Sequence, residues 1–234
     1  RILSSSAFPM AGSFLEDGSY QKGVEDYLPK DAWETDTYQE HIVRDILDNW
    51  LVLSRNGKFH AIFAVDSIPD AIRYYRTFKA QDPSFKLPCL FNPEIDNTSG
   101  QKSLDKLDGL KEILEDYNEQ FGQNFDMGGY GKFKKDVSAR LAHKAPYTRI
   151  PQAQQLNLLI VVNMMLTGFD SKWINTLYLD KVLVYQHLIQ AFSRTNRLFN
   201  INEKPFGSIR YYRKPHTMKQ AIESAVKLYS GDQP

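Results

Sequence analysis

The apolar positions of the chain change period several times, and each change predicts a different element. Short runs that are apolar at nearly every position are typical of strands buried on both faces of a parallel sheet. We expect strands at residues 60–65, 88–91, 156–162, 175–179 and 207–212. Between these runs the apolar spacing becomes three and four, which predicts amphipathic helices. We expect helices from about 37 to 53, 68 to 79, 104 to 141 with an interruption at 126–129, and 183 to 198.

The alternation of strands and helices predicts an α/β fold with a parallel sheet. The opening stretch is rich in Ser, Gly, Asp and Pro and has no sustained period. We therefore expect residues 1–55 to form an irregular lead-in followed by a helix. Residues 56–214 should form the main domain, with a helical insertion at about 103–144, and residues 215–234 should start a C-terminal helical segment.

Composition narrows the class of protein. The chain has 234 residues, of which 42% are hydrophobic and 24% charged, so it has enough apolar surface to fold. No apolar run approaches the roughly 18 to 20 residues that span a bilayer, so no membrane association is expected. Cys89 is the single cysteine and residues 1–12 do not resemble a secretory signal, so we expect a cytoplasmic protein. The five histidines never fall at paired metal-ligand spacing, so no metal site is expected.

The net charge of +1 conceals an uneven distribution. Residues 1–116 contain 13 Lys and Arg against 20 Asp and Glu, whereas residues 117–234 contain 16 against 8. This asymmetry is typical either of a face that meets phosphate or of compositional noise that folding mixes. A basic stretch within the second part could follow DNA phosphates, and a solvated helical face explains it equally well. Its members are Lys132, Lys134, Lys135, Arg140, Lys144 and Arg149.

The segment 190–197 is the first candidate for chemistry. On a helix, Gln190, Arg194 and Arg197 share one stripe about 60° wide. The opposite face carries the apolar residues Tyr185, Leu188, Ile189 and Phe192. The polar stripe is either an ordinary solvated face or a pair of guanidinium groups that bind phosphate oxygens. In the second case the arginines could stabilise the charge that develops when a γ-phosphoryl group leaves.

The loop after the most apolar predicted strand is the second candidate. Loops at the carboxyl ends of parallel strands are where α/β folds bind ligands. Gly168 would allow close approach of the backbone, and Asp170 could accept a hydrogen bond from a ribose hydroxyl. Ser67 begins the helix after residues 60–65, where its hydroxyl can cap the N–H of Asp70 or, with the same geometry, hold a phosphate.

Together these segments resemble a known family. The strings LTGFDSKWINTLYLDK (166–181) and HLIQAFSRTNR (187–197) resemble motifs V and VI of superfamily 2 helicases and translocases. They look most like the version in the restriction (R) subunit of type I restriction-modification enzymes. Residues 60–67 lie where this family has motif IV. Ser193 replaces a commoner glycine, as type I restriction subunits often do, and Val162-Asn163 replaces a common Thr-Asp pair.

The resemblance implies a three-layer RecA-like (P-loop NTPase-like) α/β domain. A complete motor also needs a Gly-x-x-x-x-Gly-Lys-Ser/Thr phosphate loop, yet Gly57-Lys58 and Gly131-Lys132 are both followed by Phe. We therefore expect the second motor lobe of a longer chain, an ATP-dependent type I site-specific deoxyribonuclease. The isolated segment should be inactive. ATP and Mg²⁺ would be bound mainly by the first lobe, which this segment lacks.

The resemblance also implies roles for individual residues. Arg197 and Arg194 would reach the triphosphate, and Gln190 would position the γ-phosphate or the attacking water. Gly168 and Asp170 would contact the nucleotide. Ser67 and Thr167 would bind the backbone of double-stranded DNA.

Further partners follow from the same resemblance. They are the first lobe and nuclease domain of the same chain and the modification and specificity subunits. Two alternatives stay open: a lobe of another superfamily 2 translocase or helicase, and a non-catalytic DNA-binding or assembly module with this fold.

Overall fold

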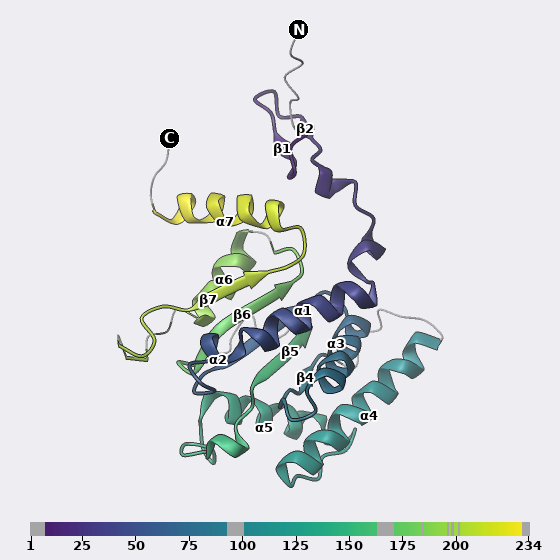
Figure 1. Ribbon diagram of the computed structural model, residues 1–234, viewed down its shortest axis with the longest axis vertical. Helices are drawn as coiled ribbons and strands as arrows, with labels where there is room; N and C mark the ends of the chain where they lie inside the picture. Colours follow the sequence, from purple (N-terminus) through teal and green to yellow (C-terminus); the bar gives the residue numbers. More distant parts are fainter. Residues whose placement is uncertain are drawn as a thin grey trace.

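The computed structural model describes residues 8–92, 101–162, 171–183, 185–195, 197, 199–200 and 202–230. A five-stranded sheet with the strand order β4-β5-β3-β6-β7 lies at its centre (Figure 1). All neighbouring strands in it are parallel. The strands are β3 (His60–Val65), β4 (Cys89–Leu90), β5 (Leu158–Val162), β6 (Ile174–Asp180) and β7 (Ser208–Tyr211).

The three central strands are buried at every position, because helices cover both faces of the sheet. Their continuous apolar runs made them visible in the sequence. All five predicted strands are present, with ends that differ from the prediction by at most two residues. The parallel α/β fold is therefore confirmed.

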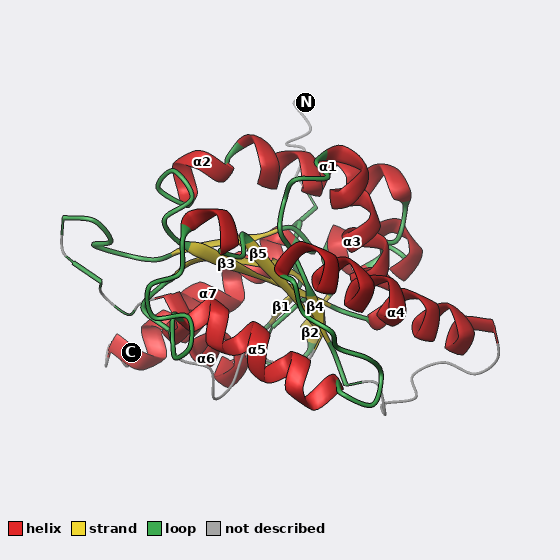
Figure 2. Ribbon diagram, turned by 90° about the horizontal axis from the view of Figure 1, so that it is seen from below, coloured by secondary structure: helices red, strands yellow, loops and turns green. Residues whose placement is uncertain are grey.

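Helices form the two outer layers of the structure (Figure 2). One face of the sheet is covered by α1 (Asp36–Asp48), α2 (Trp50–Leu53) and α3 (Ile68–Gln81), and α4 (Gln101–Phe121) packs along α3. The other face is covered by α5 (Tyr130–Ala142), α6 (Tyr185–Thr195) and α7 (Pro215–Ser230). This arrangement confirms the predicted three layers.

Two predicted helices differ from the observed ones. The helix expected at 37–53 is divided at Asn49, whose side-chain amide bonds to the carbonyl oxygen of Asp45 (2.8 Å). The helix expected at 183–198 ends at Thr195. Near that end, the hydroxyls of Ser193 and Thr195 donate to backbone carbonyls three residues earlier, which competes with continuation of the helix.

The predicted insertion contains two helices, as expected. Its apolar residues Phe133, Val137 and Leu141 on α5, and Leu110 and Ile113 on α4, are buried in the same core as the sheet. Leu107 lies one helical turn before Leu110, but it is 45% exposed. The short element η3 (Gln152–Gln154) precedes β5.

The lead-in is more ordered than its composition suggests. It contains an antiparallel hairpin of β1 (Ser13–Phe14) and β2 (Tyr20–Gln21), which extends away from the sheet in Figure 1. Two short 3-10 helices follow, η1 (Val24–Asp26) and η2 (Lys30–Trp33). The carboxylate of Glu25 accepts the N–H groups of His216 (2.9 Å) and Thr217 (2.8 Å), which ties the lead-in to the start of α7.

Candidate functional site

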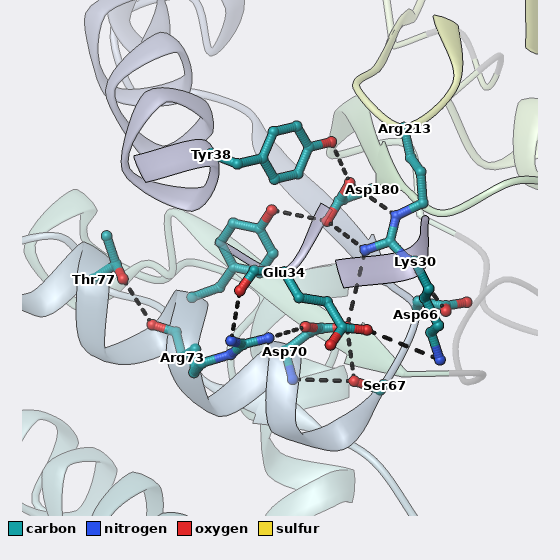
Figure 3. A network of polar contacts seen from close by, with 11 residues as sticks. Lys30, Glu34, Tyr38, Asp66, Ser67, Asp70, Arg73, Thr77, Asp180 and Arg213 are labelled. Atoms are coloured by element: carbon teal, nitrogen blue, oxygen red, sulfur yellow. Dashed lines mark hydrogen bonds and ion pairs between the residues drawn. The ribbon is translucent and has the colours of Figure 1, made fainter. Parts of the chain in front are cut away.

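Charged residues gather where the carboxyl ends of three strands meet. Asp66 and Ser67 directly follow β3, Asp180 is the last residue of β6, and Arg213 lies two residues after β7. Figure 3 shows these side chains pointing toward one another. Because the strands are parallel, residues far apart in sequence meet at a single edge of the sheet. We call this group the carboxyl-edge network.

Asp180 is the centre of the carboxyl-edge network and is fully buried. Its carboxylate accepts hydrogen bonds from the hydroxyls of Tyr38 (2.7 Å) and Tyr74 (2.8 Å). It also accepts from Arg213 through Nε (3.4 Å) and Nη2 (3.2 Å). Burial raises the pKa of Asp180, whereas Arg213 and the two tyrosine hydroxyls act in the opposite direction. Burial beside this carboxylate also raises the pKa of both tyrosines.

Arg213 connects three strand ends through its guanidinium group. Besides Asp180, it bonds to Asp66 through Nη1 (3.2 Å) and lies 4.0 Å from Asp70. Burial lowers the pKa of Arg213, but the surrounding carboxylates outweigh burial and raise it above its usual value. The side chain is therefore a fixed cation that holds the end of β7 against the turn after β3.

Ser67 caps α3, as the sequence predicts. Its hydroxyl oxygen accepts the N–H of Asp70 (3.2 Å) and its proton is donated to the Asp70 carboxylate (2.7 Å). The other carboxylate oxygen of Asp70 accepts from Arg73 (2.7 Å), which also donates to the carbonyl of Glu34 (2.8 Å). The turn proposed to bind a DNA phosphate is thus built rigidly on buried charged groups.

The two sides of α6 differ in their exposure to solvent. Leu188 and Ala191 are buried toward the sheet, whereas Gln190 is exposed on the outer side of the helix. The amphipathic interpretation of this helix is therefore correct. Arg197 is exposed but lies beyond the end of α6, so the prediction that it shares a helical stripe with Gln190 is wrong.

Four predicted site residues fall outside this description in whole or in part. Thr167, Gly168 and Asp170 lie outside the described residues, as does the side chain of Arg194, although its backbone belongs to α6. The roles expected for these four residues therefore stay predictions.

The described end of α6 lies far from Ser67 in the fold. A Cβ at Gly207 would lie 2.3 Å from the Cβ of Thr195, and Gly207 immediately precedes the amino end of β7. The last turn of α6 is thus at the amino edge of the sheet, whereas Ser67 is at the carboxyl edge. The fold separates the two sets of candidate residues.

The amino edge carries a second polar pair that the sequence did not single out. His60 begins β3, and its Nδ1 lies 2.7 Å from the carbonyl oxygen of Leu156. Its Nε2 lies 2.7 Å from Nε2 of His143, whose ring stacks on Trp173. Burial lowers the pKa of His60 to about 3, with a further contribution from His143, and it lowers the pKa of His143 to about 4.

One member of the predicted basic stretch is not at the surface. The guanidinium of Arg140 is buried between the rings of Phe121 (4.2 Å) and Tyr147 (4.1 Å). It donates to the hydroxyl of Tyr117 (3.1 Å) and to the carbonyl of Gln154 (2.9 Å). Arg140 is therefore a packing residue, and its assignment to a phosphate-binding face is wrong.

The described residues offer neither a metal centre nor a membrane span. Among them, no group of three or more His, Cys, Asp or Glu side chains could hold a metal ion. The same part of the chain contains no helix that is both long and apolar enough to cross a membrane.

Two residues of the carboxyl-edge network could have been recognised as site candidates from the sequence. Asp180 follows the apolar run Leu177–Leu179 directly, and Arg213 follows the last strand closely. Charged residues at the ends of buried strands are candidates for an edge site. Tyr38, from α1, has no such signal, because only the fold brings it to Asp180.

The chain is similar to proteins of one known family. A family model described as type I restriction enzyme subunit R domain 3 matches residues 57–214. A type I restriction enzyme endonuclease subunit of Staphylococcus aureus (strain COL) is 34% identical over 92% of this chain and 22% of its own length. Another, from Staphylococcus saprophyticus, is 37% identical over 88% of this chain and 22% of its own length.

Among solved structures, the S. cerevisiae Dbp5 C-terminal domain bound to Gle1 and IP6 aligns over 86% of this chain and 82% of its own. The identity is 12% and the TM-score is 0.41. The chain spans about a fifth of the length of the curated relatives. The family model covers the five-stranded sheet, and the two relatives are 34% and 37% identical to this chain over the aligned residues, so the chain belongs to the type I restriction enzyme R subunit family.

Proposed function

We propose that this segment is the second, RecA-like motor lobe of an ATP-dependent, DNA-translocating type I restriction subunit. It completes an ATP site whose phosphate loop and Mg²⁺ ligands come from the first lobe of the same chain. It also binds duplex DNA. The full-length subunit carries the nuclease domain and works in the cytoplasm with modification and specificity subunits.

The separation of Ser67 from the end of α6 is the observation that carries this proposal. A translocase must contact DNA and nucleotide at the same time, so it needs two sites that are linked but do not overlap. Ser67 stands at the carboxyl edge, and Gln190 and Arg197 are exposed on α6 and beyond it. The sheet and α6 connect the two places as one packed body.

In this mechanism the chain supplies positive charge and positioning. Arg197 and Arg194 contact the triphosphate across the cleft between lobes and stabilise the negative charge that grows on the departing phosphoryl group. Gln190 orients the γ-phosphate or the attacking water, and Gly168 and Asp170 contact the nucleotide. Ser67 and Thr167 hold the DNA backbone, so each change in cleft opening moves the DNA contact relative to the first lobe.

The test is duplex-stimulated ATP hydrolysis by the full-length subunit. Arg197→Ala and Arg194→Ala should each lower turnover by about 10³ to 10⁵, the usual effect of removing such an arginine, while nucleotide binding is largely retained. Arg44→Ala, which removes an exposed arginine from α1, is the matched control and should leave turnover unchanged.

Other outcomes point to different functions. Normal turnover in both arginine variants would contradict the catalytic assignment and favour a non-catalytic DNA-binding or assembly module. Arginine-dependent ATP hydrolysis and translocation by a full-length chain that never cleaves DNA would indicate another superfamily 2 translocase.

A further inference from the structure

The exposed face of α5 and the turn after it form a cationic surface outside the motif residues. The surface consists of five exposed side chains, Lys132, Lys134, Lys135, Lys144 and Arg149. We call it the α5 basic face. It lies on the side of the sheet that α5 shares with α6 and α7 (Figure 2).

The charge of the α5 basic face is uncompensated. Asp136 is the only acidic residue between positions 127 and 162. Its carboxylate is occupied by the hydroxyls of Tyr117 and Tyr147 and lies 3.7 Å from Arg140. Among the described residues, none of the five cations forms an ion pair.

Exposed lysines on two other helices behave differently. Lys111 on α4 and Lys219 on α7 each lie within 4.0 Å of a glutamate one helical turn further on, Glu115 and Glu223. An ordinary solvated helix face in this chain therefore mixes both signs of charge. The α5 basic face carries one sign only, which favours a polyanionic partner over simple solvation.

The backbone that carries the cations is held in place by the contacts of the turn after α5. Tyr147 folds the turn after α5 back onto the helix through Asp136 and packs its ring on Arg140. The N–H of Lys144 bonds to the carbonyl of Ala139 (2.9 Å), which closes the C-terminal end of α5. Lys144 and Arg149 are thus presented on a built turn beside the helical lysines.

We infer that the α5 basic face binds the phosphate backbone of duplex DNA, as a second contact beyond the motif residues. A helix of 13 residues is about 20 Å long, and duplex DNA carries about one phosphate charge per 1.7 Å of axis. The face therefore spans enough backbone to meet several phosphates. This inference rests on the proposed function, because it requires that the full-length subunit binds duplex DNA.

The test compares salt-dependent duplex binding by three forms of the full-length subunit, measured by fluorescence anisotropy. One form is the wild type, and one carries Lys132→Gln, Lys135→Gln and Lys144→Gln. The charge-matched control carries Lys58→Gln, Lys111→Gln and Lys219→Gln, three lysines with exposed side chains that each lie within 4.0 Å of a glutamate. Thermal unfolding checks that all three forms are folded.

The α5 variant should bind DNA at least tenfold more weakly at low salt, and its affinity should converge with the wild type as salt rises. Neutralising one phosphate releases counterions that contribute about 0.9 to the slope of log K against log salt. Removing three cations should therefore reduce the magnitude of this slope by about 2 to 3. The control should keep the wild-type slope, and arginine at the three α5 positions should restore it.

Two results would overturn the inference and leave the proposed function standing. Equal slopes in the α5 variant and the control would assign the face to solvation. Unchanged DNA binding with weakened assembly with the modification and specificity subunits would make the face a protein-docking surface. If the wild type itself neither binds duplex DNA nor hydrolyses ATP in its presence, the proposed function fails, and the inference fails with it.

Discussion

At the residue scale, the carboxyl-edge network shows how this chain accommodates buried charge. A buried ion pair is tolerated only when its hydrogen bonds are complete. Asp180 meets this condition with donors from α1, α3 and the segment after β7. Loss of one partner should therefore destabilise the chain, because Asp180, Tyr74 and Arg213 are all buried.

Asp180→Asn should therefore destabilise the chain strongly. The amide removes the negative charge that balances buried Arg213, and breaking a buried pair in this way costs about 3 to 5 kcal/mol. Glu112→Gln is the matched control, because Glu112 pairs with Arg76 at 2.8 Å on the surface, where a pair contributes about 0 to 1 kcal/mol. Urea unfolding of both variants measures the difference. Equal losses of stability would show that the carboxyl-edge network does not support the fold.

At the element scale, what the sequence revealed depended on how each element is stabilised. The central strands were predictable because burial on both faces requires apolar residues throughout. The helix start at Ser67 was predictable because capping is local in sequence. The end of α6 was not, because Ser193 and Thr195, whose hydroxyls bond to carbonyls three residues earlier, also occur within helices and mark no end by themselves.

The candidate site was also predictable only where its features are local in the sequence. The solvent-facing side of α6 was visible in its apolar period, so the exposure of Gln190 was predictable. The carboxyl-edge network was not assembled from sequence, because Tyr38 and Asp180 are 142 positions apart and only the strand order brings them together. Arg140 was misassigned because charge alone does not reveal that two aromatic rings enclose it.

The packing between α6 and β7 can be tested with one methyl group. Gly207→Ala would place a Cβ 2.3 Å from the Cβ and 2.4 Å from the carbonyl oxygen of Thr195, so the backbone must shift. We expect a decrease in stability of about 1 to 3 kcal/mol, as for other overpacked positions. Gly131→Ala is the control, because its Cβ would meet nothing within 4 Å and alanine favours the α5 helix by about 0.5 to 1 kcal/mol. Opposite shifts in melting temperature are expected; parallel shifts would disprove the packing argument.

At the scale of the whole molecule, the two edges of the sheet differ in their response to acid. The carboxyl edge holds charged groups in ion pairs, whereas the amino edge holds the neutral pair of His60 and His143. A carbonyl oxygen only accepts, so His60 Nδ1 must carry its proton toward Leu156. His60 Nε2 is then the acceptor, and His143 Nε2 donates to it. A second proton on His60 would go to its Nε2, so the N–H groups of His60 and His143 would then point at each other.

The stability of the molecule should therefore fall as the pH drops below about 6.5. Burial holds the pKa of His60 at about 3 and that of His143 at about 4, both below the ordinary value of 6.5. The unfolded chain takes up protons first, so stability that is complete above pH 6.5 is lost progressively as pH falls toward these values. Over this pH range, one such group lowers the free energy of unfolding by about 1.4 kcal/mol per pH unit. For buried His60 the decrease between about pH 6.5 and pH 5 is about 2 kcal/mol. Half-buried His143 should contribute less, because solvent screens it.

Urea unfolding at about pH 7, 6 and 5 measures this decrease in stability, and a substitution at His143 measures the share that His143 contributes. His143 has a φ of 50°, a conformation that asparagine tolerates, so His143→Asn keeps the turn and supplies an amide donor. Because it removes one titrating group, this variant should lose less stability than the wild type does between about pH 7 and pH 5. His41→Asn, which changes an exposed histidine of α1, should follow the wild type. If His143→Asn loses stability in parallel with both, His143 does not contribute to the acid sensitivity.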